Sequence, residues 1–157
     1  MNSAKKANIM DTSAIKAVVF DCDGVMFDTA LANRKFYNDL LAAFNKAPLD
    51  DEQFENIHMM TVRAAVEYLY PEMDDHQPVY KMIKSIGYES VVPLMLMEPG
   101  LIELLDAIKQ AGLVRGVATN RTNTMGRVLI EDKLKKSFDI VVPASDVGNA
   151  KPFPDQL

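Results

Sequence analysis

The stretch "VVFDCDGVMFD", residues 18 to 28, decides the fold. An apolar, β-branched run ends there in two acids separated by one residue, and a glycine follows. A carboxylate is costly where it can be neither hydrated nor paired, so a strand that delivers Asp21 and Asp23 together needs a positive partner at its end. The partner that we expect is a metal ion.

Two further apolar runs alternate with helical patterns. We expect strands at 15–20, 113–119 and 138–145, each buried on both faces of a parallel sheet, because their apolar character is nearly continuous. Helical spacing predicts helices at 99–112 and 122–136. This alternation is typical of an α/β fold with a parallel sheet, in which ligands bind beyond the carboxyl ends of the strands.

The segment 29–98 interrupts this alternation. Its patterns predict helices at 31–45, 51–58, 61–70 and 76–87, and a short piece near 90–97. Single crossings at 28 and 98 would let this module swing as a lid. We therefore expect three parts, which are an N-terminal tail (1–14), a discontinuous core (15–28 and 99–157) and a helical cap (29–98).

Composition narrows the classes of partner. The chain has 157 residues, is 48% hydrophobic and carries a formal net charge of −5. An acidic surface gains nothing from meeting a polyanion, which argues against nucleic acid and anionic membranes as partners. No run approaches the ~20 apolar residues of a membrane span, and a single cysteine, Cys22, forms no internal disulfide. We expect a cytoplasmic protein.

Three motifs in order resemble those of the haloacid dehalogenase-like (HAD) superfamily of phosphohydrolases. The first is D-x-D-G at 21–24, whose continuation "VMFDT" is similar to the phosphoglycolate phosphatase and β-phosphoglucomutase branch. The second is "VATN" with Thr119, and the third is "AKPFPD" with Lys151. The resemblance covers about residues 15 to 157 and implies a Rossmann-like core with an inserted helical cap.

The resemblance also implies roles for the two acids. Asp21 would be the nucleophile that becomes an aspartyl phosphate, and Asp23 the general acid and base. Asp21 and the backbone carbonyl of Asp23 would hold Mg²⁺, which prefers oxygen ligands. Read alone, the two acids could instead cap a turn with Gly24, although their place after a buried run favours a phosphate or metal site.

The other motif residues would bind the phosphoryl group. By the resemblance, the Thr119 hydroxyl, the Asn120 backbone N–H and the Lys151 ammonium would contact its oxygens. Gly24 would supply the turn beside them. Read alone, Thr119 is a strand residue or helix cap, and Lys151 is a solvated surface charge.

The function expected is a magnesium-dependent phosphomonoester hydrolase of a small phosphorylated metabolite. Two alternatives stay open, which are a phosphosugar mutase with the same residues and a non-catalytic binding or scaffold protein with a degenerate phosphatase fold. A phosphoreceiver domain is disfavoured by the helical interruption. No residue of the cap identifies the substrate.

A fourth motif of the family, a later strand ending in acids that complete the magnesium site, has no counterpart before Leu157. We therefore expect the C-terminal strands of the core to be missing. The chain would then be a truncated, cleaved or incomplete form of a longer phosphatase, with weakened magnesium binding or no activity. The first strand would be a sheet edge, open to pairing in a homo-oligomer or with another chain.

Overall fold

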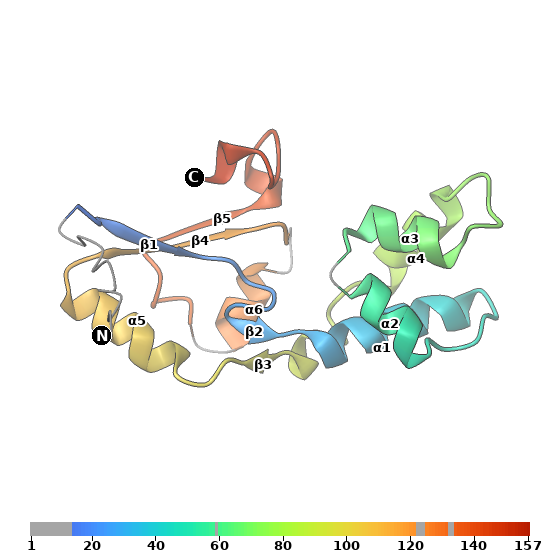
Figure 1. Ribbon diagram of the computed structural model, residues 1–157, viewed down its shortest axis with the longest axis horizontal. Helices are drawn as coiled ribbons and strands as arrows, with labels where there is room; N and C mark the ends of the chain where they lie inside the picture. Colours follow the sequence, from blue (N-terminus) through green and yellow to red (C-terminus); the bar gives the residue numbers. More distant parts are fainter. Residues whose placement is uncertain (1–13, 59, 122–124, 132–133) are drawn as a thin grey trace, which may run out of the picture.

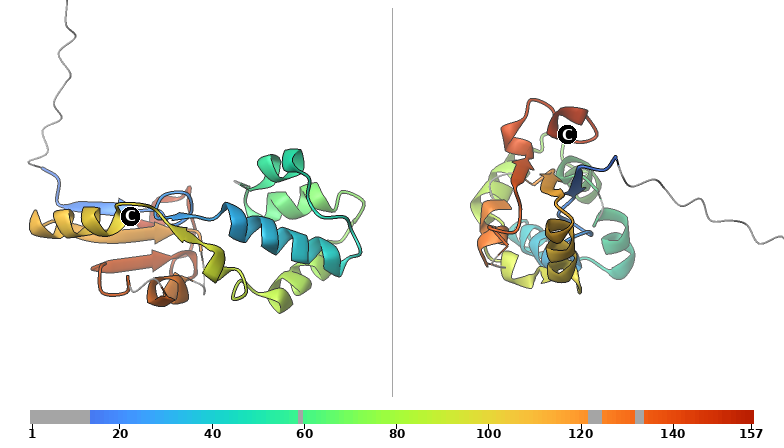
Figure 2. Two further views of the ribbon diagram at one scale, coloured as in Figure 1. Left: turned by 90° about the horizontal axis from the view of Figure 1, so that it is seen from below. Right: turned by 90° about the vertical axis from the view of Figure 1, so that its left-hand side faces the viewer.

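The computed structural model describes residues 14–58, 60–121, 125–131 and 134–157. They form two parts (Figure 1). One part is a sheet with the helices that pack on it, and the other is a group of helices. Figure 2 shows from a second direction that the two parts lie end to end. The predicted tail lies outside the described residues, apart from Ala14.

Three parallel strands form the central sheet, in the order β1-β4-β5. They are β1 (Ala17–Phe20), β4 (Val114–Thr119) and β5 (Ile140–Pro143), and each is shorter than predicted. The predicted parallel α/β sheet is confirmed. In the described part of the chain β1 lies at the sheet edge, as expected.

One face of this sheet is covered and the other is largely open. Phe20 and Val117 are neighbours in register and are both buried. Val19 and Ile140 lie one position earlier, on either side of Gly116, and are 48% and 54% exposed. The prediction of burial on both faces is therefore wrong for β1, and for β5, whose residues are exposed or half-buried, whereas β4 is buried from its second residue onward. The described helices beside the sheet lie on one side of it (Figure 1), and Phe20 belongs to the same buried core as their side chains.

Two helices cover that side of the sheet, α5 (Leu101–Gln110) and α6 (Met125–Glu131). Glycines bracket α5, since Gly100 at φ +82° precedes it and Gly112 at φ +72° follows it. Glycine tolerates such positive φ angles better than other residues do. The ends predicted for α6 lie partly at 122–124 and 132–133, outside the described residues.

The cap is built of helices within two residues of the predicted bounds, followed by the 3₁₀ turn η1 (Val92–Leu94). The helices are α1 (Ala30–Ala43), α2 (Asp51–Ile57), α3 (Val62–Leu69) and α4 (Gln77–Ile86). Their apolar stripes meet in a core of side chains that includes Phe36, Leu40, Tyr70 and Val79. In the described part, no helix is long and apolar enough to cross a membrane.

A two-stranded ribbon joins the cap to the sheet. The strands β2 (Phe27–Asp28) and β3 (Leu96–Met97) pair antiparallel, with Asp28 opposite Leu96. The sequence predicted two single crossings here, because two-residue strands carry no periodicity from which pairing could be read. After β5 the chain makes two short 3₁₀ turns, η2 (Ala144–Asp146) and η3 (Pro154–Gln156).

Candidate active site

The carboxyl end of the sheet brings Asp21 and Lys151 together. Asp21 follows β1 directly, and Lys151 lies in the loop between η2 and η3. The Lys151 ammonium is 2.8 Å from Asp21 Oδ1 and also donates to the Ala118 carbonyl at 2.9 Å. The Cys22 N–H donates to the same Asp21 oxygen at 2.7 Å. The Asp21 carboxylate is thus paired with the Lys151 ammonium of the same chain.

Thr119 and Asn120 tie this end of β4 to the Lys151 loop. The Thr119 side chain is buried, and its hydroxyl oxygen accepts the Arg121 N–H at 3.1 Å. Asn120 is exposed and binds the Lys151 backbone in both directions, donating to its carbonyl at 3.1 Å and accepting its N–H at 3.0 Å. Gln156, which sequence reasoning missed, donates to the Thr119 carbonyl at 2.7 Å. No periodicity or spacing marks Gln156 as part of this loop.

Gly24 lies in the tight turn that presents Asp23. It has φ +69°, and its N–H donates to the Phe27 carbonyl at 2.9 Å. The N–H groups of Met26 and Phe27 both donate to the Cys22 carbonyl. A Cβ added at Gly24 would meet nothing within 4 Å, so the backbone angle rather than crowding favours glycine here.

The Asp23 side chain is bound to Arg121, a residue that the sequence prediction did not include. Arg121 Nε donates to both oxygens of Asp23 at 3.0 Å, and a terminal guanidinium nitrogen donates to Oδ1 at 2.6 Å. The two acids of the motif therefore have different partners, Lys151 for Asp21 and Arg121 for Asp23. The position of Arg121, two residues after Thr119, could have marked it as a candidate site residue. Its partner Asp23 could not be read from this spacing, because it lies 98 residues away in the sequence.

Burial shapes the protonation of the groups around this ion pair. Desolvation is the largest single influence on the pKa of Arg121 and lowers it, but the hydrogen bonds to Asp23 and the nearby negative charges, that of Asp23 first, together outweigh it and leave the pKa above its ordinary value. Burial, followed by the charge of Asp23, raises the pKa of the Cys22 thiol to about 12. Because a thiol needs to ionise to attack, Cys22 is a poor nucleophile at neutral pH.

Tyr88, which follows α4, is a cap residue whose pKa responds to the charges of this site. The Tyr88 ring stacks on Phe36 of α1, with ring centroids 4.2 Å apart and planes at 14°. Burial is the main cause of its raised pKa, and the charges of Arg121 and Asp23 also act on it.

The oxygen donors present fit a hard divalent cation. The Asp21 side chain is 43% exposed, so a carboxylate oxygen is accessible, and the Asp23 carbonyl is a second oxygen of the kind that Mg²⁺ prefers. Within the described residues no group of three or more His, Cys, Asp or Glu side chains gathers around one point. The remaining ligands would have to be substrate and water oxygens.

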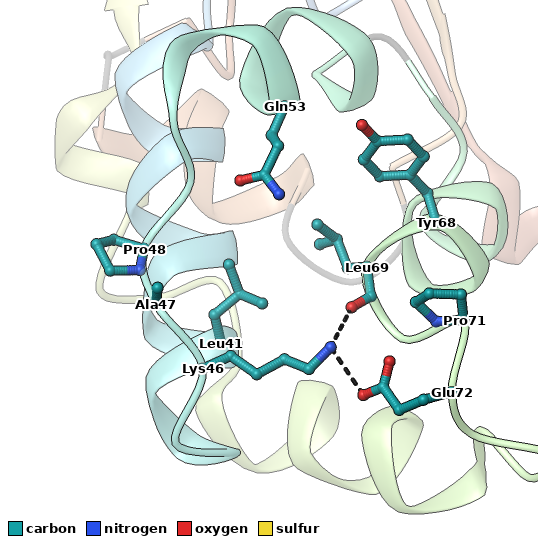
Figure 3. A pocket seen from close by; sticks show the side chains of 9 residues that line it. All are labelled: Leu41, Lys46, Ala47, Pro48, Gln53, Tyr68, Leu69, Pro71 and Glu72. Atoms are coloured by element: carbon teal, nitrogen blue, oxygen red, sulfur yellow. Dashed lines mark hydrogen bonds and ion pairs between the residues drawn. The ribbon is translucent and has the colours of Figure 1, made fainter.

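A separate hollow of about 370 Å³ is lined by residues of the cap, none of which belongs to these motifs (Figure 3). Its lining cation is Lys46, which donates to the Leu69 carbonyl at 2.6 Å and pairs with Glu72 at 2.8 Å. Since both contacts already engage the ammonium, this hollow is a poorer place for a phosphate than the carboxyl end of the sheet.

Comparisons with known proteins agree with the α/β fold of the chain. The family model of haloacid dehalogenase-like hydrolases matches residues 18–157. The chain belongs to this family.

Three similar proteins extend the comparison. The solved structure of a HAD-superfamily hydrolase, subfamily IA, variant 1, from Geobacter sulfurreducens is 38% identical, with a TM-score of 0.76 over 90% of this chain and 69% of that one. An N-acetylmuramic acid 6-phosphate phosphatase of Pseudomonas aeruginosa is 28% identical over 94% of this chain and 67% of its own length. A phosphonoacetaldehyde hydrolase of Nitratidesulfovibrio vulgaris is 28% identical over 69% of this chain. The match spans only 42% of that hydrolase.

Proposed function

We propose that the protein is a magnesium-dependent phosphomonoester hydrolase that acts on a small phosphorylated metabolite through an aspartyl phosphate. The observation that carries this proposal is the 2.8 Å contact between Lys151 and Asp21 at the carboxyl end of the sheet, in a chain of this family. A relative named as the phosphatase of a phosphorylated sugar acid supports the class of substrate.

In the first step a carboxylate oxygen of Asp21 attacks the phosphorus atom of the substrate. The new P–O bond forms as the bond from phosphorus to the ester oxygen breaks. For this step Asp23, which is a carboxylate paired with Arg121 in the free protein, has to take up a proton, and it gives that proton to the leaving oxygen. The products are the free alcohol and a phosphorylated Asp21. Because a carboxylate is the nucleophile, one difficult displacement becomes two easier ones.

In the second step water attacks the phosphorus atom of the aspartyl phosphate. Asp23, now a carboxylate, takes a proton from the water as the new P–O bond forms and the bond to Asp21 breaks. Inorganic phosphate leaves, and both acids return to their starting states.

Three groups stabilise the charge on the phosphoryl oxygens. The Lys151 ammonium neutralises part of it, and the Thr119 hydroxyl and Asn120 N–H are hydrogen-bond donors. Accepting the Arg121 N–H occupies a lone pair of the Thr119 oxygen and leaves its proton to donate. Mg²⁺, held by Asp21 and the Asp23 carbonyl, would offset a repulsion of about 4 kcal/mol between like charges ~4 Å apart at an effective dielectric of ~20.

The test is release of inorganic phosphate from an aryl phosphate, with and without Mg²⁺. We expect turnover that EDTA abolishes, and a loss of more than about 10³-fold in Asp21→Asn, because the amide is no nucleophile. The matched control is Asp28→Asn, which changes an acid seven residues further along that accepts the Ala30 N–H rather than facing Lys151. Rapid quenching and mass spectrometry should find the phosphoryl group on Asp21.

Inactivity of both the wild-type chain and the Asp21→Asn variant would contradict this function and favour a non-catalytic binding protein. A phosphosugar mutase would use the same residues, and product analysis separates the two reactions. A hydrolase releases inorganic phosphate, whereas a mutase returns an isomeric phosphosugar.

A further inference from the structure

The ion pair between Asp23 and Arg121 holds the whole Asp23 carboxylate. Both oxygens accept hydrogen bonds from Arg121 Nε at 3.0 Å, and Oδ1 accepts a third from a terminal nitrogen at 2.6 Å. The Arg121 side chain is 11% exposed, whereas Asp23 is 41% exposed. A forked, charge-assisted bond of this kind orients a carboxylate far more firmly than a single contact does.

The backbone of Arg121 is itself fixed at the carboxyl ends of two strands. Its N–H donates to the Thr119 hydroxyl at 3.1 Å, and its carbonyl accepts the Ala144 N–H at 2.9 Å. Arg121 therefore links the strand that carries Thr119 to the turn that carries Asp23. The orientation of Asp23 depends on a residue that does not neighbour it in the sequence.

We propose that Arg121 is a positioning residue that holds the Asp23 carboxyl group in place for its proton transfers. This inference rests on the proposed function, since it assigns Arg121 to the general acid and base of that reaction. Without the guanidinium, a half-exposed Asp23 on a turn would sample several rotamers and meet the leaving oxygen less often. Arg121 acts through Asp23 and not on the substrate, because its guanidinium is nearly buried and already engaged.

The chain offers a matched control for this ion pair. Arg115, which lies on β4, forms a forked pair with Asp139, with distances of 3.2 Å and 3.0 Å. Its side chain is 8% exposed and that of Asp139 is 46% exposed, close to the values for Arg121 and Asp23. Arg115 lies at the opposite end of β4 from Thr119, so its loss removes a similar ion pair away from the site.

The kinetic experiment compares Arg121→Met, Arg121→Lys and Arg115→Met in magnesium-dependent hydrolysis of an aryl phosphate. We expect Arg121→Met to lower kcat by about tenfold or more while KM stays within about threefold, because orientation and not substrate binding is lost. Arg121→Lys should recover part of kcat, since one ammonium can hold one carboxylate oxygen. Arg115→Met should keep the wild-type kcat even if its melting temperature falls as far as that of Arg121→Met.

Three kinetic results would overturn the proposal. A raised KM at unchanged kcat in Arg121→Met would make Arg121 a substrate-binding group. An equal loss of kcat in Arg115→Met would make the effect a general loss of stability, and wild-type kinetics in Arg121→Met would leave Arg121 without a role in the reaction.

Hydrogen exchange measured by mass spectrometry tests the positioning even if the wild-type chain releases no phosphate. The N–H groups of Gly24, Met26 and Phe27 are hydrogen-bonded within the Asp23 turn. We expect them to exchange about tenfold faster in Arg121→Met and in Asp23→Asn, with no further gain in the double variant, because both changes break one ion pair. Unchanged exchange in Arg121→Met would refute the positioning role, whereas inactivity of the wild type with faster exchange would refute only the proposed hydrolysis.

Discussion

Lys151 has two oxygen partners, the Asp21 carboxylate and the Ala118 carbonyl. These contacts hold its positive charge beside the Asp21 oxygen that we propose as the nucleophile. Its backbone is fixed by Asn120, so neither end of this residue is free to drift. Under the proposed function, the positive charge at this position would already be in place before a substrate phosphate binds.

Replacing Lys151 tests that role. We expect Lys151→Met to lower kcat for an aryl phosphate by about 10²–10³-fold, as for the loss of one strong oxyanion donor, with little loss of stability because Asp21 is partly solvated. Steady-state kinetics and a thermal melt measure the two effects. Lys109→Met, a change in α5 away from the site, is the control. Equal activity of the two variants would contradict the role.

The residues of the site were predictable to different degrees. Asp21, Thr119 and Lys151 lie in short motifs whose order along the chain carries information, and the structure brings all three to one end of the sheet. Arg121 and Gln156 were missed because each acts through a contact with a distant segment. Sequence patterns reveal local spacing. Gln156 has no such pattern, and the spacing of Arg121 from Thr119 does not reveal that its partner is Asp23.

At the scale of the elements, Tyr70 joins two helices of the cap. It ends α3 with a fully buried ring, and its hydroxyl donates to the Leu40 carbonyl of α1 at 3.2 Å. The Lys46 ammonium lies 4.7 Å from the ring centroid. Burial, and then the charge of Glu72, raises the pKa of Tyr70 from 10.0 to about 12.

This raised pKa predicts a pH dependence of stability. The folded cap favours the neutral phenol, so its contribution is complete below pH 10 and is lost as the pH rises from 10 through about 12. We expect Tyr70→Phe to cost about 1 kcal/mol at neutral pH through the lost hydrogen bond, and the wild type to lose its advantage above pH 10. Urea unfolding of both proteins at several pH values measures the difference. A difference that stays constant with pH would contradict it.

The helices of the cap were predicted well because they carry both an apolar stripe and clear ends. Asp50 accepts the Gln53 N–H at 2.8 Å, and Gln53 returns a bond to the Asp50 N–H at 3.2 Å, which starts α2 where the sequence placed it. The β2–β3 pairing was missed because it involves two residues on each side. Elements this short depend on tertiary contacts and not on periodicity.

On the scale of the whole molecule, the sheet combines an edge strand with an open apolar face. In the described residues β1 has a partner on one side only, and Val19 and Ile140 lie side by side across Gly116. Unpaired strand edges and exposed apolar patches both favour association between chains.

We therefore expect the protein to associate as its concentration rises and Val19→Lys to weaken that association, because a lysine on an edge strand opposes pairing. Sedimentation velocity over a wide range of concentrations measures it. The control is Val25→Lys, since Val25 is 50% exposed, close to the 48% of Val19, but lies in the turn after β1. A monomer at every concentration, in wild type and variant alike, would refute the expectation.

The ribbon of β2 and β3 has a practical consequence for protein engineering. Because Asp28 and Leu96 are paired, the two ends of the excursion through the cap are neighbours across one antiparallel ladder, about 5 Å apart at their Cα atoms. A two-residue hairpin turn could bridge that gap. The helices between them could thus be excised or exchanged for those of another family member without redesigning the sheet. If the proposed function holds, such exchanges would test whether substrate choice and phosphoryl chemistry can be recombined as separate modules.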